Sequence, residues 1–382
     1  MTRRISVLTT SRSDYGLLRP ILRAINYHDD LTLQLLVSGT HLSTQHGRTI
    51  TEIEADDLPI AAQMDLGLNE VDSGSRSAVG MLASITAQAG DVLHRLQPDV
   101  LLVLGDRYEV LGACTAALVL GIPVAHIHGG ELTLGAIDDA VRHAITKIAA
   151  LHFPVHGVYA RRIEQLGEEP HRVKLIEPPV AETLSEFRPQ SRAELNRQLD
   201  VTFERRLVSL TFHPSTTNVN ESLVELSEVL LALEALPDLT VVVSGMNADP
   251  GSGEHQAMLK SFVSRDPTRR VLIESLGHNR YLSLLHWCDC VIGNSSSGLI
   301  EAPLLGTPSI NIGNRQEGRI AAPSVSSVKG VSADILVALR RVLAAPRGVP
   351  RRLPIVRVGK VVADTLSSFD FSLPKRFIDT HD

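Results

Sequence analysis

The run Val100-Leu-Leu-Val-Leu104, followed at once by Gly105-Asp106-Arg107, decides the fold expected of this chain. Every residue of the run is apolar, so both faces of the strand must be buried, which is typical of a parallel sheet covered by helices on both sides. The glycine and the charged residues after it mark the carboxyl end of the strand, where such sheets bind their ligands. The sequence therefore predicts a doubly wound α/β domain around this strand.

Similar runs recur along the chain, with helical patterns between them. In the first part they are Ile5–Thr9, Leu33–Val37, Pro123–His126 and His152–Val155. The rhythm restarts at Leu207-Val-Ser-Leu-Thr-Phe212 and continues through Leu239–Val243, Val271–Glu274, Cys290–Ile292 and Ser309–Ile312. The repetition predicts a second Rossmann-like domain.

The boundary between the two domains is predicted near residue 180. Prolines in Glu177-Pro-Pro-Val180 and in the polar stretch Arg188-Pro-Gln-Ser191 suit a surface crossing between sheets. We therefore expect an N-terminal domain over residues 1–178 and a C-terminal domain over residues 179–360. The last helical stretch, within 361–382, is a candidate to pack back on the first domain.

Composition and charge exclude several classes of protein. Hydrophobic residues make up 43% of the 382 residues, enough for two cores, and 37 basic against 43 acidic residues give a net charge of -6. That balance offers no reason to expect a nucleic acid or an anionic membrane as partner. We see no secretion signal and no apolar stretch of about 20 residues, and the cysteines form no metal-binding pattern. These features predict a cytoplasmic protein with reduced core thiols.

The turn after the first strand is a candidate phosphate site. It reads Thr9-Thr-Ser-Arg-Ser-Asp-Tyr-Gly16 and leads into a helix, where free backbone N–H groups and Arg12 can hold a phosphate. An ordinary N-cap at Ser13 or Asp14 explains the same residues equally well. The turn by itself leaves both interpretations open.

A dense group of titratable residues follows the next strands. Asp106 comes after Val100–Leu104, and the following strand ends in His126-Ile-His-Gly-Gly-Glu131, with Asp138 and Arg142 further on. Asp138 and Arg142 have the spacing of a surface ion pair on a helix. Carboxylates at buried strand ends need a reason, however, so the group as a whole predicts a catalytic site.

In the second domain, polar side chains again follow the strands. His213 and Asn247 lie in the first two loops, and Gly293-Asn-Ser-Ser-Ser-Gly298 precedes a helix, where its hydroxyl and N–H groups can cradle a diphosphate. Glu301, one turn into that helix, can accept hydrogen bonds from the ribose hydroxyls, and Arg315 adds a cation. The competing interpretation is a serine-rich helix cap with a solvated glutamate and ordinary surface arginines.

The order and span of these motifs resemble the hydrolysing UDP-N-acetylglucosamine 2-epimerases of sialic acid biosynthesis. The resemblance runs from about residue 5 to about residue 370. It rests on Ser11-Arg-Ser-Asp-Tyr-Gly16, Gly105-Asp-Arg-Tyr-Glu109, His126-Ile-His-Gly-Gly-Glu131, Ala136-Ile-Asp-Asp139, Arg142-His-Ala-Ile-Thr-Lys147, Asn247-Ala-Asp-Pro-Gly251 and Gly293-Asn-Ser-Ser-Ser-Gly-Leu-Ile-Glu-Ala-Pro303. It implies the fold of the GT-B type glycosyltransferases, two Rossmann-like domains that face each other across the cleft that holds the site.

The resemblance implies conversion of UDP-N-acetylglucosamine and water to N-acetylmannosamine and UDP, by elimination to 2-acetamidoglucal and hydration. A base must break the C–H bond at C2 while the diphosphate leaves C1, and carboxylates suit this work. The resemblance implies that Asp106, Glu131 and Asp138 act as acid and base, without showing which residue is which, and that His213 assists the departing diphosphate. It also implies two groups of binding residues: for UDP, Arg12, Ser295, Ser296, Glu301 and Arg315; for the sugar, His128, Arg142 and Asn247.

The sequence departs from the family pattern at Ile176-Glu-Pro-Pro-Val180, where relatives usually carry a glycine in place of Glu177. The added charge and lost backbone freedom can alter the sugar pocket or weaken activity, or can be a hinge variation without effect.

Four other functions stay open. They are the same reaction on a UDP-diacetamido-trideoxy sugar of the legionaminic acid pathway, a non-hydrolysing UDP-sugar 2-epimerase, a GT-B glycosyltransferase, and a catalytically silent nucleotide-sugar binding protein. We expect a UDP-sugar as ligand, no metal or cofactor, and a homodimer or homotetramer.

Overall fold

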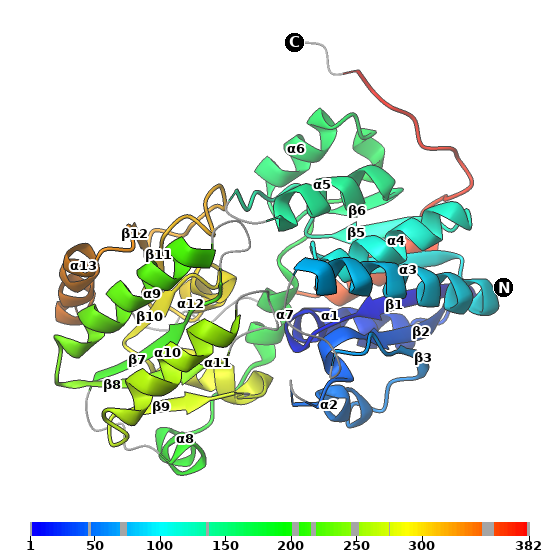
Figure 1. Cartoon of the computed structure of the whole chain (residues 1–382). Helices are drawn as coiled ribbons and strands as arrows, with labels where there is room; N and C mark the ends of the chain where they lie inside the picture. Colours follow the sequence, from blue (N-terminus) through cyan, green and yellow to red (C-terminus); the bar gives the residue numbers. More distant parts are fainter. Residues whose placement is uncertain are drawn as a thin grey trace. The chain divides into compact units, whose positions relative to one another are not determined.

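Each of the two units of the chain is built on one six-stranded parallel sheet, as the computed structural model shows (Figure 1). Unit 1 comprises Met1–Glu131, Asp138–Ser185 and Ile355–Asp382, and unit 2 comprises Leu132–Ile137 and Glu186–Pro354. The structure describes residues 2–44, 47–68, 75–134, 137–200, 206–214, 219–245, 252–274, 276–345 and 355–379. The α/β class predicted from the sequence is confirmed.

The sheet of unit 1 has the strand order β3-β2-β1-β4-β5-β6. Its strands are β1 (Arg3–Thr9), β2 (Leu31–Ser38), β3 (Ile60–Met64), β4 (Val100–Leu104), β5 (Val124–Ile127) and β6 (Leu151–Phe153). Its helices are α1 (Arg12–Asn26), α2 (Ile50–Glu54), α3 (Ser75–Leu96), α4 (Tyr108–Val119), α5 (Asp138–Ile148), α6 (Gly157–Gln165), α7 (Pro179–Glu186) and α14 (Val358–Ser368). The strand β4, from which the fold was predicted, is central.

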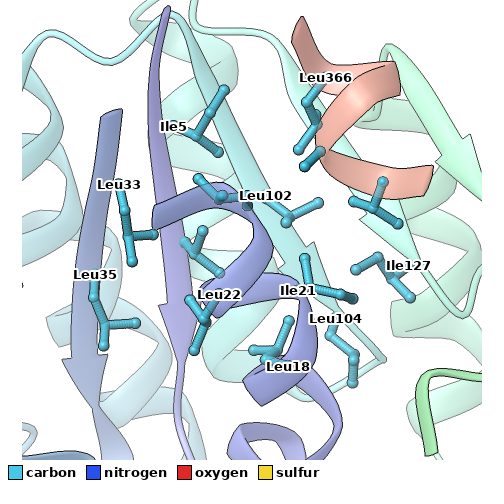
Figure 2. Close-up of a cluster of buried hydrophobic side chains, with 14 of the residues drawn as sticks. Ile5, Leu18, Ile21, Leu22, Leu33, Leu35, Leu102, Leu104, Ile127 and Leu366 are labelled. Atoms are coloured by element: carbon cyan, nitrogen blue, oxygen red, sulfur yellow. The ribbon is translucent and has the colours of Figure 1, made fainter. Parts of the chain in front are cut away.

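Successive residues of β4 enter different cores, which shows that both faces of this sheet are covered. Leu102 and Leu104 belong to the cluster that α1, α2 and α14 complete, and Figure 2 shows Leu18 and Leu22 of α1 and Leu366 of α14 among the strand residues. Leu101 and Val103 belong to the cluster formed with α3, α4 and α5. This arrangement is the physical reason why the strand is apolar throughout.

Unit 2 repeats the plan with the order β12-β11-β10-β7-β8-β9. Its strands are β7 (Arg206–Thr211), β8 (Leu239–Ser244), β9 (Arg270–Ile273), β10 (Cys290–Gly293), β11 (Ser309–Ile312) and β12 (Val325–Val328). Its helices are α8 (Arg192–Leu199), α9 (Val219–Glu234), α10 (Ser252–Ser264), α11 (His278–Trp287), α12 (Glu301–Leu304) and α13 (Ser332–Ala344). One core joins the sheet to α9, α10 and α13.

The chain crosses between the units at several places. The main division lies after Ser185, within α7, whereas the sequence predicted it after residue 178. The short segment Leu132–Ile137 clusters with unit 2, where the Leu134 N–H donates to the Glu317 carbonyl at 3.2 Å. The helix α14 belongs to unit 1 and packs against α1.

The proline pair after Glu177 begins a helix. The side chain of Glu177 is exposed, and Pro179 is the first residue of α7, a position that suits proline. Glu177 is absent from the residues with positive φ, so its backbone does not need the freedom of a glycine. Further along α7, Glu182 accepts a hydrogen bond of 2.7 Å from the Gly359 N–H at the start of α14.

Within the described part of the chain, no helix is both long enough and apolar enough to cross a membrane. The cysteines Cys114, Cys288 and Cys290 are buried free thiols, as predicted from their apolar surroundings.

Packing of α14 on α1 requires a glycine at residue 359, and this gives a stability prediction. A Cβ built on Gly359 lies 2.4 Å from the Pro20 carbonyl oxygen of α1, whereas a Cβ on Gly90 in α3 has nothing within 4 Å. We expect Gly359→Ala to lower the free energy of unfolding by about 1–3 kcal/mol. Gly90→Ala is expected to raise it by about 0.5–1 kcal/mol, because alanine loses less entropy in a helix. Urea titrations followed by circular dichroism measure both, and an unchanged Gly359→Ala would contradict the packing described.

Candidate active site

A buried arginine gathers the predicted residues of unit 1. Arg142, on α5, is 1% exposed, and its guanidinium pairs with Asp106 at the end of β4. Nη1 of the same side chain donates to the Glu131 carbonyl at 3.0 Å and lies 3.7 Å from Asp139. The strands β4 and β5 are neighbours, so the arginine joins the loops at their carboxyl ends. The sequence suggested an ion pair between Arg142 and Asp138, the first residue of α5. The ion pairs of Arg142 described here are with Asp106 and Asp139 instead.

The turn His128–Glu131 has a backbone that few residues can adopt. His128 has φ 66° and Gly130 has φ 78°, both in the left-handed region. A Cβ on Gly130 lies 2.3 Å from the Tyr159 carbonyl oxygen, so a larger residue does not fit there. The turn brings His128 Nδ1 to 2.5 Å from Glu131 Oε1. His128 Nε2 is buried and has no hydrogen-bond partner among the described residues, which is uncommon for a buried polar atom.

His126, inside β5, holds the loop that carries Asp106. Its Nε2 lies 2.7 Å from the Gly105 carbonyl oxygen. A carbonyl can only accept, so we assign the proton to Nε2. Burial lowers the pKa of His126 to about 3, which keeps the ring neutral. Gly105 itself has φ 83°, and the histidine fixes this unusual turn.

The turn after β1 is also built by side-chain contacts. The α1 helix begins at Arg12, and its N-cap is Ser11, not Ser13 or Asp14 as the ordinary interpretation supposed. Asp14 instead reaches back and accepts from the Thr10 N–H at 2.7 Å. Arg12 is therefore the first helical residue, at the positive end of the helix dipole, where an anion is stabilised.

In unit 2, Asn294 connects the loops after β7, β10 and β11. Its Oδ1 accepts from the His213 N–H at 2.7 Å, and its Nδ2 donates to the His213 carbonyl at 2.8 Å. The Asn294 carbonyl accepts from Arg315 Nη1 at 3.1 Å and from Gln316 Nε2 at 2.9 Å. The three strands are adjacent in the sheet, so His213 and Arg315 are tied to one residue at its carboxyl edge.

The serine-rich loop forms a short turn of 3-10 helix after β10. Ser295 is its N-cap and accepts from the Ser297 N–H at 3.4 Å, while Ser296 is the first residue of the turn. Glu301 is the first residue of α12, a correction to its predicted place one turn into a helix, because the 3-10 turn comes in between. Burial, with the charge of Glu301, raises the pKa of Tyr281.

The structure thus groups the predicted residues by unit. Arg12, Asp106, His128, Glu131, Asp138 and Arg142 follow the adjacent strands β1, β4 and β5, and His213, Ser295, Ser296, Glu301 and Arg315 follow β7, β10 and β11. Asn247 lies outside the described residues.

Comparison with known proteins shows the family of the chain. A model of the family described as UDP-N-acetylglucosamine 2-epimerase matches residues 23–354. The chain belongs to this family. The GDP/UDP-N,N'-diacetylbacillosamine 2-epimerase (hydrolyzing) of Campylobacter jejuni is 35% identical over 323 residues, which cover 85% of this chain and 83% of that protein. The UDP-N-acetylglucosamine 2-epimerase of Neisseria meningitidis serogroup B is 28% identical over 386 residues, 99% of both chains.

Solved structures agree on the fold. The crystal structure of UDP-GlcNAc 2-epimerase from Neisseria meningitidis bound to UDP-GlcNAc superposes with a TM-score of 0.80 at 17% identity, over 95% of this chain and 99% of that chain. The match to the family model thus confirms the epimerase family recognised from the motifs, and the superposition confirms the GT-B type fold.

Two residues of this epimerase were within the quoted motifs, but sequence reasoning gave them no role. His126 and Asn294 act on the main chain of neighbouring loops, at Gly105 and His213. The sequence did contain a signal for both residues, because each is a polar residue inside or directly after an apolar strand. Which carbonyl or N–H they reach depends on the sheet order, which the sequence does not give.

The neutral His126 predicts a pH dependence of stability. Its pKa is about 3 in the folded protein and about 6.5 in the unfolded chain, so the unfolded chain binds a proton first as the pH falls. The contribution of His126 to the free energy of unfolding is complete above pH 6.5 and is lost towards about pH 3. Between these values the free energy of unfolding falls by up to about 1.4 kcal/mol per pH unit. His126→Gln keeps an N–H donor without the titration, so its stability should fall less steeply between about pH 6.5 and pH 4.

Urea unfolding at a series of pH values tests this expectation. His94→Gln, at an exposed histidine of α3, is the matched control. An equal slope for His126→Gln and the unmodified chain would show that His126 is not held neutral.

Proposed function

We propose that the protein is a hydrolysing 2-epimerase that removes UDP from a UDP-2-acetamido sugar and inverts C2. The observation that carries the proposal is the group of Asp106, Glu131 and Arg142 at the carboxyl edge of the unit 1 sheet, within a chain of the epimerase family. A plain nucleotide-binding edge needs donors and cations. A reaction that breaks and remakes a C–H bond needs carboxyl groups as well.

The C2 proton is assigned to the carboxyl groups of unit 1. Removal of this proton, with departure of UDP from C1, gives a 2-acetamidoglucal, and addition of water at C1 with protonation at C2 from the other face gives the inverted free sugar. Asp106 is the exposed partner of its ion pair, with 20% of its side chain accessible against 1% for Arg142. That difference supports contact of Asp106 with substrate, while Arg142 holds it from behind. Glu131 and Asp138 supply the other proton transfers.

The diphosphate is assigned to cations and N–H groups. Arg12 at the start of α1 and Ser295 and Ser296 of the 3-10 turn supply donors, and Arg315 supplies charge. His213 assists the leaving phosphate, and Glu301 holds the ribose. Charge neutralisation at the bridging oxygen lowers the cost of breaking the C1–O bond.

The sugar itself has two candidates. UDP-N-acetylglucosamine is the substrate implied by the motifs, and it is named for the Neisseria relative. The second candidate is a UDP-diacetamido-trideoxy sugar, supported by the name of the Campylobacter relative. The two differ at C4 and C6, away from the reacting carbons, so the same carboxyl chemistry serves both.

Incubation in deuterated water separates the possible activities. Either UDP-sugar is mixed with the protein and the products are followed by NMR. We expect free 2-epimerised sugar with deuterium at C2, and the faster substrate identifies the sugar. An intact UDP-sugar labelled at C2 would identify a non-hydrolysing epimerase instead. Neither exchange nor UDP release from either substrate would overturn the proposal.

A charge-neutral substitution tests the role of Asp106. Asp106→Asn is expected to lower kcat by at least about 100-fold, because the amide cannot transfer the proton, while UDP affinity stays within about threefold. The matched control is Asp99→Asn, at the amino end of the same strand, where Asp99 accepts from the Arg4 N–H at 2.7 Å. Turnover and calorimetric UDP titration measure the two effects. A large loss of UDP affinity with little change in kcat would refute the assignment.

A further inference from the structure

The main chain at His213 lies beyond the hydrogen-bonded ladder of its strand. β7 ends at Thr211, so His213 lies two residues beyond the end of its strand. The side-chain amide of Asn294 accepts a hydrogen bond from the N–H of His213 and donates one to its carbonyl. Two hydrogen bonds to one residue fix both the position and the rotation of its peptide planes.

We propose that Asn294 is a positioning residue for the diphosphate end of the reaction. Its side chain sets His213, and its main-chain carbonyl sets the guanidinium of Arg315. The inference rests on the functions proposed above for His213 and Arg315. It adds that their mutual placement is determined by one residue that does not touch the substrate.

The backbone around Asn294 explains why its short side chain reaches the peptide groups of His213. Gly293 has φ 137°, and a Cβ built on it lies 1.8 Å from the Thr211 carbonyl oxygen. The Asn294 N–H donates to the same carbonyl at 3.2 Å. A glycine is therefore required for this close approach to β7, and the approach places the Asn294 amide beside His213.

The contact with His213 needs one hydrogen-bond donor and one acceptor on a side chain of this length, and the primary amide of asparagine supplies both. An aspartate offers acceptors alone, and a leucine of similar size offers neither donor nor acceptor. Asn294 is 1% exposed and His213 is 7% exposed, so water does not compete well for these bonds. Loss of the amide therefore removes two buried hydrogen bonds that hold the His213 peptide groups.

A double-mutant cycle tests whether Asn294 acts through His213. Asn294→Ala is expected to lower kcat by about 30- to 100-fold with KM within about threefold, because displacement of a catalytic group acts mainly on the chemical step. In His213→Ala the group that Asn294 positions is already absent. The double variant Asn294→Ala, His213→Ala should therefore have the kcat of His213→Ala alone. Losses that multiply would show a merely structural role and overturn the inference.

A control in the same sheet accounts for general loss of stability. Thr307, at the amino edge before β11, is 0% exposed and donates to the Leu285 carbonyl at 2.7 Å. Thr307→Val removes one buried hydrogen bond at nearly constant volume, so it should lower Tm but leave kcat within about twofold. If Asn294→Ala and Thr307→Val lower kcat equally, the proposal fails.

The same cycle separates this inference from the proposed function. If His213→Ala keeps full activity, the role of His213 is wrong; if it loses activity but the cycle is multiplicative, only the role of Asn294 is wrong. If neither UDP-sugar is turned over by the unmodified protein, the proposed function is wrong, and the inference about Asn294 falls with it.

Discussion

The buried charge of Arg142 is the constraint on which the unit 1 site depends. A guanidinium that is 1% exposed costs several kcal/mol unless acceptors surround it. Its acceptors come from different segments: the Asp106 carboxylate after β4, the Glu131 carbonyl after β5, and Asp139 on its own helix. Satisfying the cation therefore fixes the loops relative to one another. The arrangement of the carboxyl groups follows from this requirement, so removal of the arginine charge would disturb several of them together.

In unit 2, a neutral side chain holds neighbouring loops in place relative to one another. Asn294 satisfies peptide groups through its amide and adds no charge, and its main-chain carbonyl accepts a hydrogen bond from Arg315 Nη1. Neutral histidines do comparable work in unit 1. Burial lowers the pKa of His41 to about 4, and its ring links Thr9, the last residue of β1, to Thr49. In both units, neutral side chains, namely His41, His126 and Asn294, thus hold loops at the carboxyl edge of the sheet.

The sequence predicted the central strands of both sheets and the edge strands β6 and β9, but it missed the edge strands β3 and β12. β4 and β11 match their predicted residues, and the other core strands differ by one or two positions, because apolar runs buried on both faces are easy to read. β3 (Ile60–Met64) and β12 (Val325–Val328) were not predicted, since edge strands are short and partly exposed and lack that pattern. The candidate site residues were predicted from their place after strands, and the structure places those that it describes there. His126 and Asn294 received no role, because their partners are main-chain groups on neighbouring strands.

Whether a residue has a partner within the chain also explains why the reaction is easier to infer than the sugar. The motif residues are held by contacts inside their own unit, such as Arg142 with Asp106 and Asn294 with His213, so the motif and the local structure carry the same information. Side chains that separate one acetamido sugar from another need no internal partner, because their contacts are made only with the ligand. Such residues leave no mark on the burial pattern or on the hydrogen bonds of the chain. The contacts within each unit therefore support the proposed reaction without distinguishing between the two candidate sugars.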